Sequence, residues 1–152
     1  MGTPLRDRLI GAWKLVDVVE LPAGGGPERR PFGERPLGLI LYTPDGYMSA
    51  QLAERASGDG DGPRHVAYSG TFVVDEDAGT VAHGVVISLR PDWVGTEQLR
   101  TVTFDGDELV LAIAVPRPSG APPAGAPTAE RPLVTTRIRW RRAGTPGCEH
   151  GM

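Results

Sequence analysis

The amino-acid sequence predicts an all-β protein, an eight-stranded antiparallel up-and-down barrel preceded by a short N-terminal helix. Three observations favour this fold. About eight short segments alternate apolar and polar residues, turn residues separate most of them, and no long segment has helical spacing. Sequential hairpins indicate a meander, and closing the meander into a barrel removes its exposed edge strands.

The first two elements are predicted from their end signals and from alternation. Thr3 and Pro4 can serve as the N-cap and the first residue of a short helix, which Gly11 would end. A strand follows over residues 12–21, with Trp13 and other apolar residues on one face.

A hairpin is predicted after a long loop rich in Pro and Gly, Pro22–Pro36. Two apolar runs in the stretch 38–52 flank the residues Thr43-Pro44-Asp45-Gly46. Pro in the second turn position and Gly in the fourth favour a type I turn.

Five further strand segments complete the predicted barrel. Asp105 and Gly106 are a strong hairpin signal between two of them. Two more stretches rich in Gly or Pro, Ala53–Arg64 and Pro116–Pro132, are predicted to be loops, and we expect Pro22–Pro36 and Pro116–Pro132 to border an open end of the barrel. The five segments are 65–75, 81–89 (with Val81, His83, Val85, Ile87 and Leu89 on one face), 97–104, 108–115 and 133–140.

Length and composition limit the possible functions. The 152 residues predict one domain, with a barrel over residues 1–143 and a flexible tail over 144–152. A net charge of −3 provides no basic surface for nucleic acid. The single cysteine, Cys148, allows no disulfide within the chain. The charged start and the lack of a long apolar run predict neither a signal peptide nor a membrane span, so we expect a cytoplasmic protein.

No strong motif for a metal or a cofactor is present. The three histidines, His65, His83 and His150, do not have the spacing of metal ligands. The run Gly24-Gly25-Gly26 is not followed by a predicted helix, as a phosphate loop would be. We therefore expect neither a metal nor a cofactor.

Several segments resemble a known family. They are "LIGAWKLV" (9–16), "PFGERPLGLILYTPDGYMSAQL" (31–52), "YSGTFVVDEDAGTVAHGV" (68–85) and "DWVGTEQLR" (92–100). The chain is similar to the bacterial and fungal lipocalin-like domain family, whose fold is a calycin-type β-barrel. The resemblance implies that Trp13 closes one end of the barrel and that a late arginine packs on it, for which Arg137, Arg139 and Arg141 are the candidates.

His83 and Tyr68 are the candidate catalytic residues. His83 is the only histidine in the interior of a predicted strand, since His65 stands at the start of one. An imidazole among apolar residues can exchange a proton near neutral pH. The alternative is a hydrogen-bonded structural histidine. Asp17 could be a buried acid or base, or it could be exposed or paired with an arginine of a neighbouring strand.

The candidate ligand-binding residues combine aromatic, soft and polar side chains, as small-molecule sites do. The alternative is an ordinary barrel core, and alternation alone does not say which strand faces point inward. Trp93, in a turn, would be a plug or a gate at one barrel end. The candidates are Tyr42, Met48, Gln51, Phe72, Trp93 and Arg100.

Three classes of function remain open. The first is a cofactor-independent cyclase or isomerase that folds a polyketide- or terpenoid-like intermediate in the barrel lumen. The second is a carrier that binds a small hydrophobic ligand without chemistry, and the third is a filled structural barrel, which could form a homodimer. We expect a small hydrophobic partner, and neither nucleic acid nor membrane.

Overall fold

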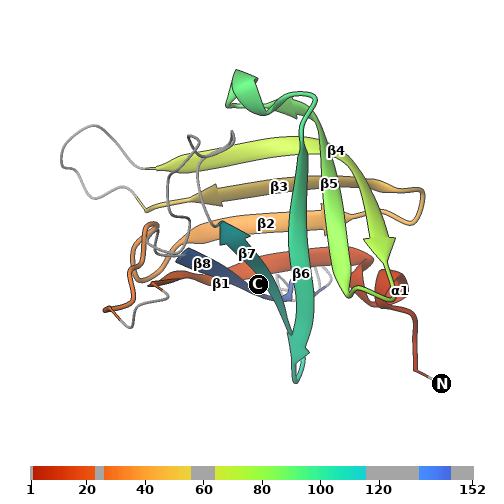
Figure 1. The fold of residues 1–152 in the computed structure, drawn as a ribbon, viewed down its shortest axis with the longest axis horizontal. Coiled ribbons are helices and arrows are strands. Elements are labelled where there is room, and N and C mark those ends of the chain that lie inside the picture. The colour runs from red at the N-terminus through yellow and green to blue at the C-terminus, as the bar shows by residue number, and fades with distance from the viewer. Residues whose placement is uncertain (1, 23–25, 56–63, 116–133, 145–152) are drawn as a thin grey trace, which may run out of the picture.

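The structure, a computed structural model, describes residues 2–22, 26–55, 64–115 and 134–144. Its eight antiparallel strands form a closed barrel in chain order, and the pairing of β1 with β8 completes it (Figure 1). This confirms the predicted barrel with a short N-terminal helix, while the predicted tail lies outside the described residues from position 145 onward. The elements are α1 (Leu5–Leu9), β1 (Gly11–Pro22), β2 (Leu37–Tyr42), β3 (Tyr47–Ala53), β4 (His65–Asp75), β5 (Thr80–Ser88), the 3₁₀ helix η1 (Pro91–Trp93), β6 (Glu97–Asp105), β7 (Glu108–Val115) and β8 (Val134–Arg142).

Alternation along β2 and β3 decides which side chains enter the barrel. Ile40, Tyr42, Met48 and Ala50 are almost fully buried inside it. The intervening residues point outward: Leu39 and Leu41 are exposed, and Ser49 is half-buried. The question of strand face that the sequence left open is therefore settled here in favour of the even-numbered residues.

The first strand presents different faces along its length because its pairing with β8 shifts between Leu15 and Asp17. Trp13 points inward before the shift, and Val18 points inward after it. Asp17 lies outside the barrel, with a carboxylate oxygen 4.0 Å from Arg30. Asp17 is therefore not a buried acid or base of the lumen: it is half-buried on the outside, beside an arginine that belongs to a loop and not to a neighbouring strand.

A second shift separates Ser69 and Gly70 in the pairing of β4 with β5. The strands approach so closely here that a Cβ atom on Gly70 would lie 1.8 Å from the carbonyl oxygen of Gly84. Alternation predicted that the residues from Val81 to Leu89 share one face, but this is wrong beyond Val85, where the shift turns the chain outward. Ile87 and Leu89 are 65% and 59% exposed.

One end of the barrel is closed by Trp13, as predicted. Its indole nitrogen donates to the carbonyl of Leu9 at 2.9 Å, and its ring packs near that of Phe104. The guanidinium of Arg142 lies 3.9 Å from the ring centroid. The expectation that Arg137, Arg139 or Arg141 would pack on Trp13 is wrong, because odd-numbered residues of β8 point outward and only Arg142 continues the inward parity.

The opening helix does not use Thr3 as its cap. It begins at Leu5, and the amides of Leu5 and Arg6 donate to the carboxylate of Glu76 at 2.8 and 3.1 Å. A residue from the turn between β4 and β5 thus satisfies the free helix amides and holds α1 across the barrel end.

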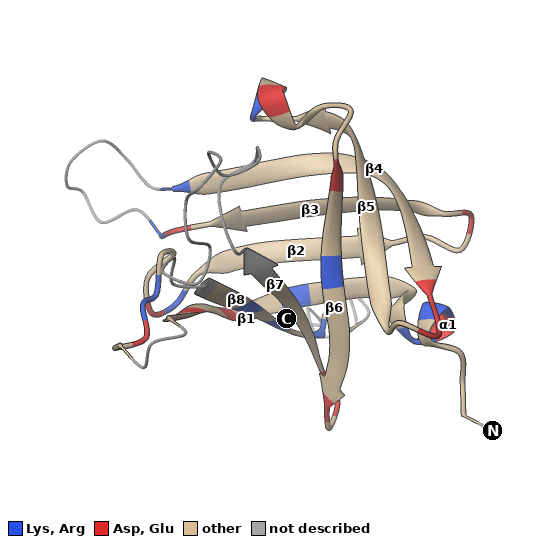
Figure 2. Ribbon diagram, viewed as in Figure 1, with Lys and Arg blue, Asp and Glu red and all other residues tan. Residues whose placement is uncertain are grey.

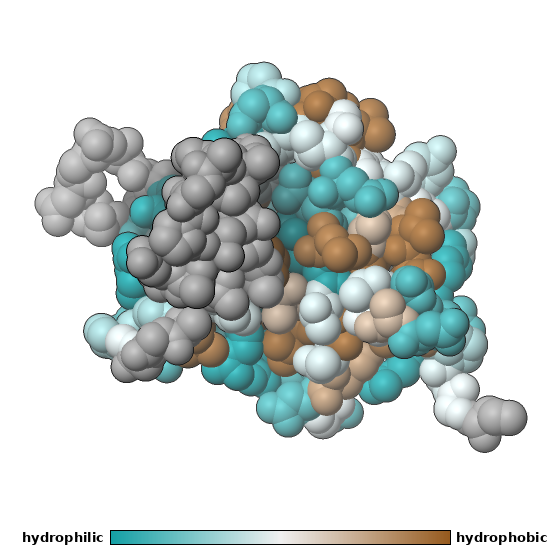
Figure 3. Space-filling view, in the orientation of Figure 1, coloured by the Kyte–Doolittle hydropathy of each residue, from teal (hydrophilic) through white to brown (hydrophobic). Residues whose placement is uncertain are grey.

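Charged residues are unevenly distributed over the strands. The middles of β3, β4 and β5 carry no lysine, arginine, aspartate or glutamate, whereas β1, β6 and β8 carry charged residues within the strand (Figure 2). Apolar side chains appear between polar ones on the face shown in Figure 3. The most exposed of the large apolar residues on β4–β6 are Val73, Val86, Ile87 and Leu99. Among the described residues, no helix has the length and apolar character needed to cross a bilayer.

Candidate functional site

A cavity of about 320 Å³ lies within the barrel, above its Trp13-closed end. This volume is at the lower end of the range for small-molecule sites. Pro31 and Phe32 border the cavity, which confirms that the loop 22–36 contributes to its rim, whereas Pro116–Pro132 lies outside the described residues. The other apolar lining residues include Val18, Ile40, Ala50, Leu52, Val66, Leu111, Ile113 and Ile138.

A hydrogen-bonded chain of three side chains crosses the interior. The hydroxyl of Tyr42 lies 2.7 Å from Nε2 of His83, and the hydroxyl of Tyr68 lies 2.7 Å from Nδ1 of the same ring. Tyr42 lies on β2, Tyr68 on β4 and His83 on β5. The pairings of β2 with β3, β3 with β4 and β4 with β5 bring these side chains together. Both ring nitrogens of His83 are therefore satisfied inside an apolar barrel.

The direction of this chain follows from the proton count. A neutral imidazole donates from one nitrogen and accepts at the other, so one tyrosine donates to His83 and the other accepts from it. The accepting hydroxyl keeps its own proton free for another partner. Tyr68 borders the cavity and Tyr42 does not, so a free hydroxyl proton is less unfavourable on Tyr68 than on Tyr42. In the favoured arrangement Tyr42 donates to Nε2, Nδ1 donates to Tyr68, and the Tyr68 proton is directed to the cavity.

Burial fixes the charge states of this chain. It lowers the pKa of His83 to about 3, and the positive charge of Arg100 acts in the same direction. Burial also raises the pKa of Tyr42 and that of Tyr68, and for Tyr68 the charge and hydrogen bonding of Arg100 partly offset the rise. At neutral pH the site therefore contains a neutral imidazole and two neutral phenols.

Two further polar groups border the cavity. Arg100 is only 7% exposed, and it donates to the carbonyl of Leu99 at 3.0 Å. Trp140 is 1% exposed, and its indole nitrogen has no hydrogen-bond partner in the described part of the chain. Both residues line the cavity, and Arg100 brings donor capacity to its wall, whereas the indole nitrogen of Trp140 is itself buried.

The structure divides the predicted site residues into three groups. Those on the cavity wall are Tyr68, His83, Trp93 and Arg100, and the Trp93 ring packs edge-on against Tyr68 with centroids 5.7 Å apart. Those buried behind the wall, nearer α1, are Tyr42, Met48 and Phe72. The prediction that Gln51 lines the lumen is wrong. Gln51 is exposed on the outer face of β3, where it hydrogen-bonds His65 at 3.3 Å. Strand alternation that places Met48 inside the barrel places Gln51 outside.

Sequence reasoning missed most of the apolar wall of the cavity, including Trp140. Alternation within 133–140 placed Trp140 with Ile138 on one face, but it did not show that this face borders a cavity. Phe32 was missed because it belongs to a loop, where no alternation applies. In the described residues no cluster of three His, Cys, Asp or Glu side chains could hold a metal ion.

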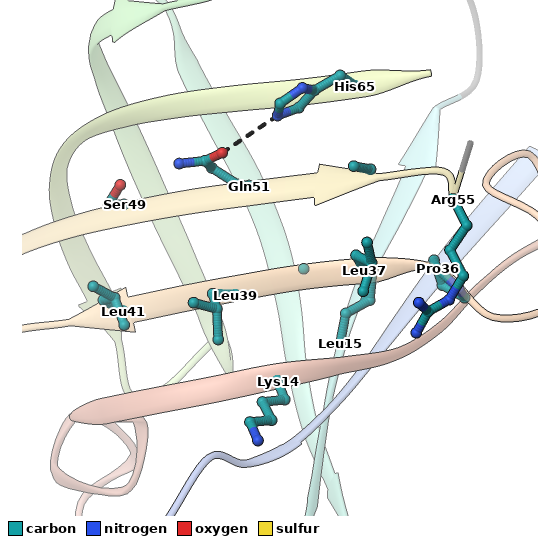
Figure 4. A pocket seen from close by; sticks show the side chains of 12 residues that line it. Lys14, Leu15, Pro36, Leu37, Leu39, Leu41, Ser49, Gln51, Arg55 and His65 are labelled. Atoms are coloured by element: carbon teal, nitrogen blue, oxygen red, sulfur yellow. Dashed lines mark hydrogen bonds between the residues drawn. The ribbon is translucent and has the colours of Figure 1, made fainter. Parts of the chain in front are cut away.

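A second hollow, of about 640 Å³, lies on the outer surface of β1–β3 (Figure 4). Leu37, Leu39 and Leu41 point toward it from β2, and Gln51 bonds His65 at its edge. It is larger than the inner cavity, but its leucines are 41–48% exposed and its polar groups are not buried. The inner cavity, with its buried and oriented donors, is the better candidate for a specific small-molecule site.

The hydroxyls of Tyr42 and Tyr68 provide a matched test of the proposed direction. Tyr42→Phe and Tyr68→Phe each remove one hydroxyl from His83, and each should lower the free energy of unfolding by about 1–3 kcal/mol. Only Tyr68→Phe should also weaken ligand binding, by about 3–10-fold, because only Tyr68 offers its proton to the cavity. Urea unfolding and probe titration of both variants measure this. Equal effects of the two variants on binding would contradict the direction.

The chain is similar to a known family over most of the described barrel. A family model described as a lipocalin-like domain matches residues 10–64 and 61–142. A 58-residue segment is 41% identical to the 4'-hydroxy-3'-methoxypropiophenone carrier protein ppsC of Aspergillus oryzae. That alignment covers 34% of this chain and 52% of the relative, so the chain matches about half the length of that protein.

Proposed function

Because the chain belongs to the lipocalin-like domain family, we propose that it is a carrier that binds one small, largely apolar molecule in its barrel lumen. The observation that supports this proposal is the inner cavity of about 320 Å³, with an apolar wall and a few buried polar groups at one side. Sites of this composition use the apolar wall for affinity and the few polar groups for orientation.

The relative's name gives independent support for a carrier. It describes a protein that carries a substituted propiophenone, which is a single aromatic ring with oxygen substituents. A molecule of about that size suits the small cavity described here. We therefore propose an aromatic or similarly compact ligand that bears oxygen.

The charge states of the inner residues favour binding over acid–base chemistry. A general acid or base works best when its pKa lies near the operating pH. Here the pKa of His83 lies at about 3, and the pKa of Tyr68 is raised, so both move away from neutrality. Of the two, Tyr68 can hold a ligand by a directed hydrogen bond, because its hydroxyl borders the cavity, whereas both nitrogens of His83 are occupied.

A cofactor-free cyclase or isomerase acting on a polyketide- or terpenoid-like intermediate is the second candidate. It is favoured by one observation, the position of Tyr68 beside Arg100 on the cavity wall. Two donors of this kind would stabilise an enolate oxygen, with His83 and Tyr68 as the catalytic residues. Catalysed exchange of α-hydrogen for deuterium in an enolisable aryl ketone would support this candidate over the carrier.

The carrier proposal is tested with N-phenyl-1-naphthylamine, an uncharged probe that fluoresces in apolar surroundings. We expect one probe to bind per chain. Ala50→Phe, on the cavity wall, should weaken binding at least about tenfold by filling space, which corresponds to about 1.4 kcal/mol. Circular dichroism and urea unfolding check that the variant remains folded.

The matched control is Gln51→Phe, at the next residue of the same strand, which places the same ring on the outer face. It should leave probe binding unchanged. If Gln51→Phe weakens binding and Ala50→Phe does not, the probe binds in the outer hollow and the lumen proposal is wrong. Absence of any saturable binding contradicts the proposal as a whole.

A further inference from the structure

Arg100 places a buried positive charge at the wall of the inner cavity. It is 7% exposed and borders the cavity. Within the described residues, no carboxylate oxygen lies within 4.0 Å of its guanidinium. A guanidinium has five N–H donors. Arg100 donates to the carbonyl of Leu99 and hydrogen-bonds Tyr68, so most of its N–H groups have no partner in the described residues.

Neighbouring residues do not neutralise this charge. Tyr68 hydrogen-bonds Arg100 on the cavity wall, but its raised pKa keeps it a neutral phenol. Glu20 also borders the cavity, yet its carboxylate lies 3.9 Å from Arg29 and is partly exposed. An uncompensated buried charge is strongly unfavourable, so a negative group placed beside Arg100 would be stabilising.

The hydrogen-bonding groups of the wall favour the same kind of ligand. Tyr68 keeps a free proton when His83 donates to it, and Arg100 has N–H groups without a partner in the described chain. Both are donors on the cavity wall. His83, which could accept, has both nitrogens occupied.

We propose that the lumen selects ligands that carry an ionised oxygen acid, either a carboxylate or an ionised phenol or enol, on a compact apolar body, with Arg100 and Tyr68 binding the anionic oxygen. This rests on the proposed function and names its ligand class. Arg100 supplies the charge and two parallel N–H groups, which match the geometry of a carboxylate. Tyr68 donates its free hydroxyl proton to the same oxygen, and His83 and Tyr42 hold that hydroxyl in orientation.

The test uses isosteric naphthalene probes whose only difference is the polar group. Isothermal titration of the full chain with 2-naphthoate, 2-naphthamide and 2-naphthylmethylammonium should show 2-naphthoate binding about 10–100-fold more tightly than the amide, the range for a hydrogen bond to a charged group. The ammonium compound should bind most weakly. 2-Naphthol, measured below and above its own pKa, distinguishes a phenolate from a carboxylate site.

Each result has a defined meaning. Tighter binding of 2-naphthoate supports a carboxylate, and tighter binding of 2-naphthol only when ionised supports a phenolate. Equal affinities for 2-naphthoate and 2-naphthamide overturn this inference and leave the carrier proposal intact. Failure of every probe, including the uncharged N-phenyl-1-naphthylamine, contradicts the carrier proposal itself.

Substitutions assign the effect to Arg100. Arg100→Gln should reduce the ratio of naphthoate to naphthamide affinity to about 1, and Arg100→Lys should retain part of it. The control is Arg137→Gln, which removes the same charge from the exposed outer face of β8 and should leave the ratio unchanged. A ratio that persists in Arg100→Gln shows that another group binds the anion. If that variant is unfolded, the wild-type probe series still decides whether the site selects anions.

Discussion

Replacing Trp13 with alanine is expected to lower the free energy of unfolding by about 3–5 kcal/mol, the range for buried aromatic residues. The ring is 1% exposed and closes the barrel end between Phe104 and the guanidinium of Arg142. The substitution would leave a void there and would remove the hydrogen bond from the indole nitrogen to Leu9. Urea unfolding followed by circular dichroism measures the change.

Two further variants make this result specific. Trp93→Ala removes the same side chain from the partly exposed helix η1 and should change the free energy of unfolding much less. Trp13→Phe keeps part of the packing and should recover part of the stability lost in Trp13→Ala. A loss below about 1 kcal/mol in Trp13→Ala would show that this ring does not hold the barrel end closed.

Acid should destabilise the barrel through His83. Its folded-state pKa of about 3 lies below the ordinary value of 6.5, so between these values the unfolded chain binds a proton that the folded chain does not. The stability due to the neutral ring is therefore fully present above pH 6.5 and decreases as the pH falls toward 3. At about 1.4 kcal/mol per pH unit, roughly 3 kcal/mol should be lost by about pH 4.

The variant His83→Gln separates this contribution from that of the carboxylates. An amide can also donate and accept a hydrogen bond, but it does not titrate. Between pH 7 and pH 4 the wild type should lose about 3 kcal/mol more free energy of unfolding than His83→Gln. Glu108, whose pKa is lowered by hydrogen bonds from Arg141 and Arg139, titrates in both proteins and cancels from the difference. Parallel pH profiles for the two proteins would rule out the linkage to His83.

Much of the fold could be predicted from the sequence because local signals agree with it. Alternation predicted the strands, and turn residues such as Asp105 and Gly106 predicted the connections. The two register shifts could not be predicted, since each depends on how a strand pairs with its neighbour. They explain why β1 changes its inward face after Leu15 and why Ile87 is exposed.

The candidate site was predictable only in part, for the same reason. Alternation correctly placed Tyr68 with Phe72, and His83 with Val85, on shared faces, and the structure buries both faces. It could not show that Tyr42 bonds His83, because that contact depends on the registers of three strand pairs. Gln51 was predicted from its chemistry rather than from its position, and alternation from Met48 already excluded it.

The pairing of β1 with β8 has a consequence for the order in which the molecule can be made. During synthesis on the ribosome, the first strand emerges long before its last partner, so the barrel remains open until residues 134–142 are available. Joining two strands from opposite ends of the chain closes a long loop, which is slow because of its entropy. Until then β1 and β7 present unpaired edges, to which other nascent chains could add. The free chain therefore acquires its enclosed lumen only after synthesis of the last strand.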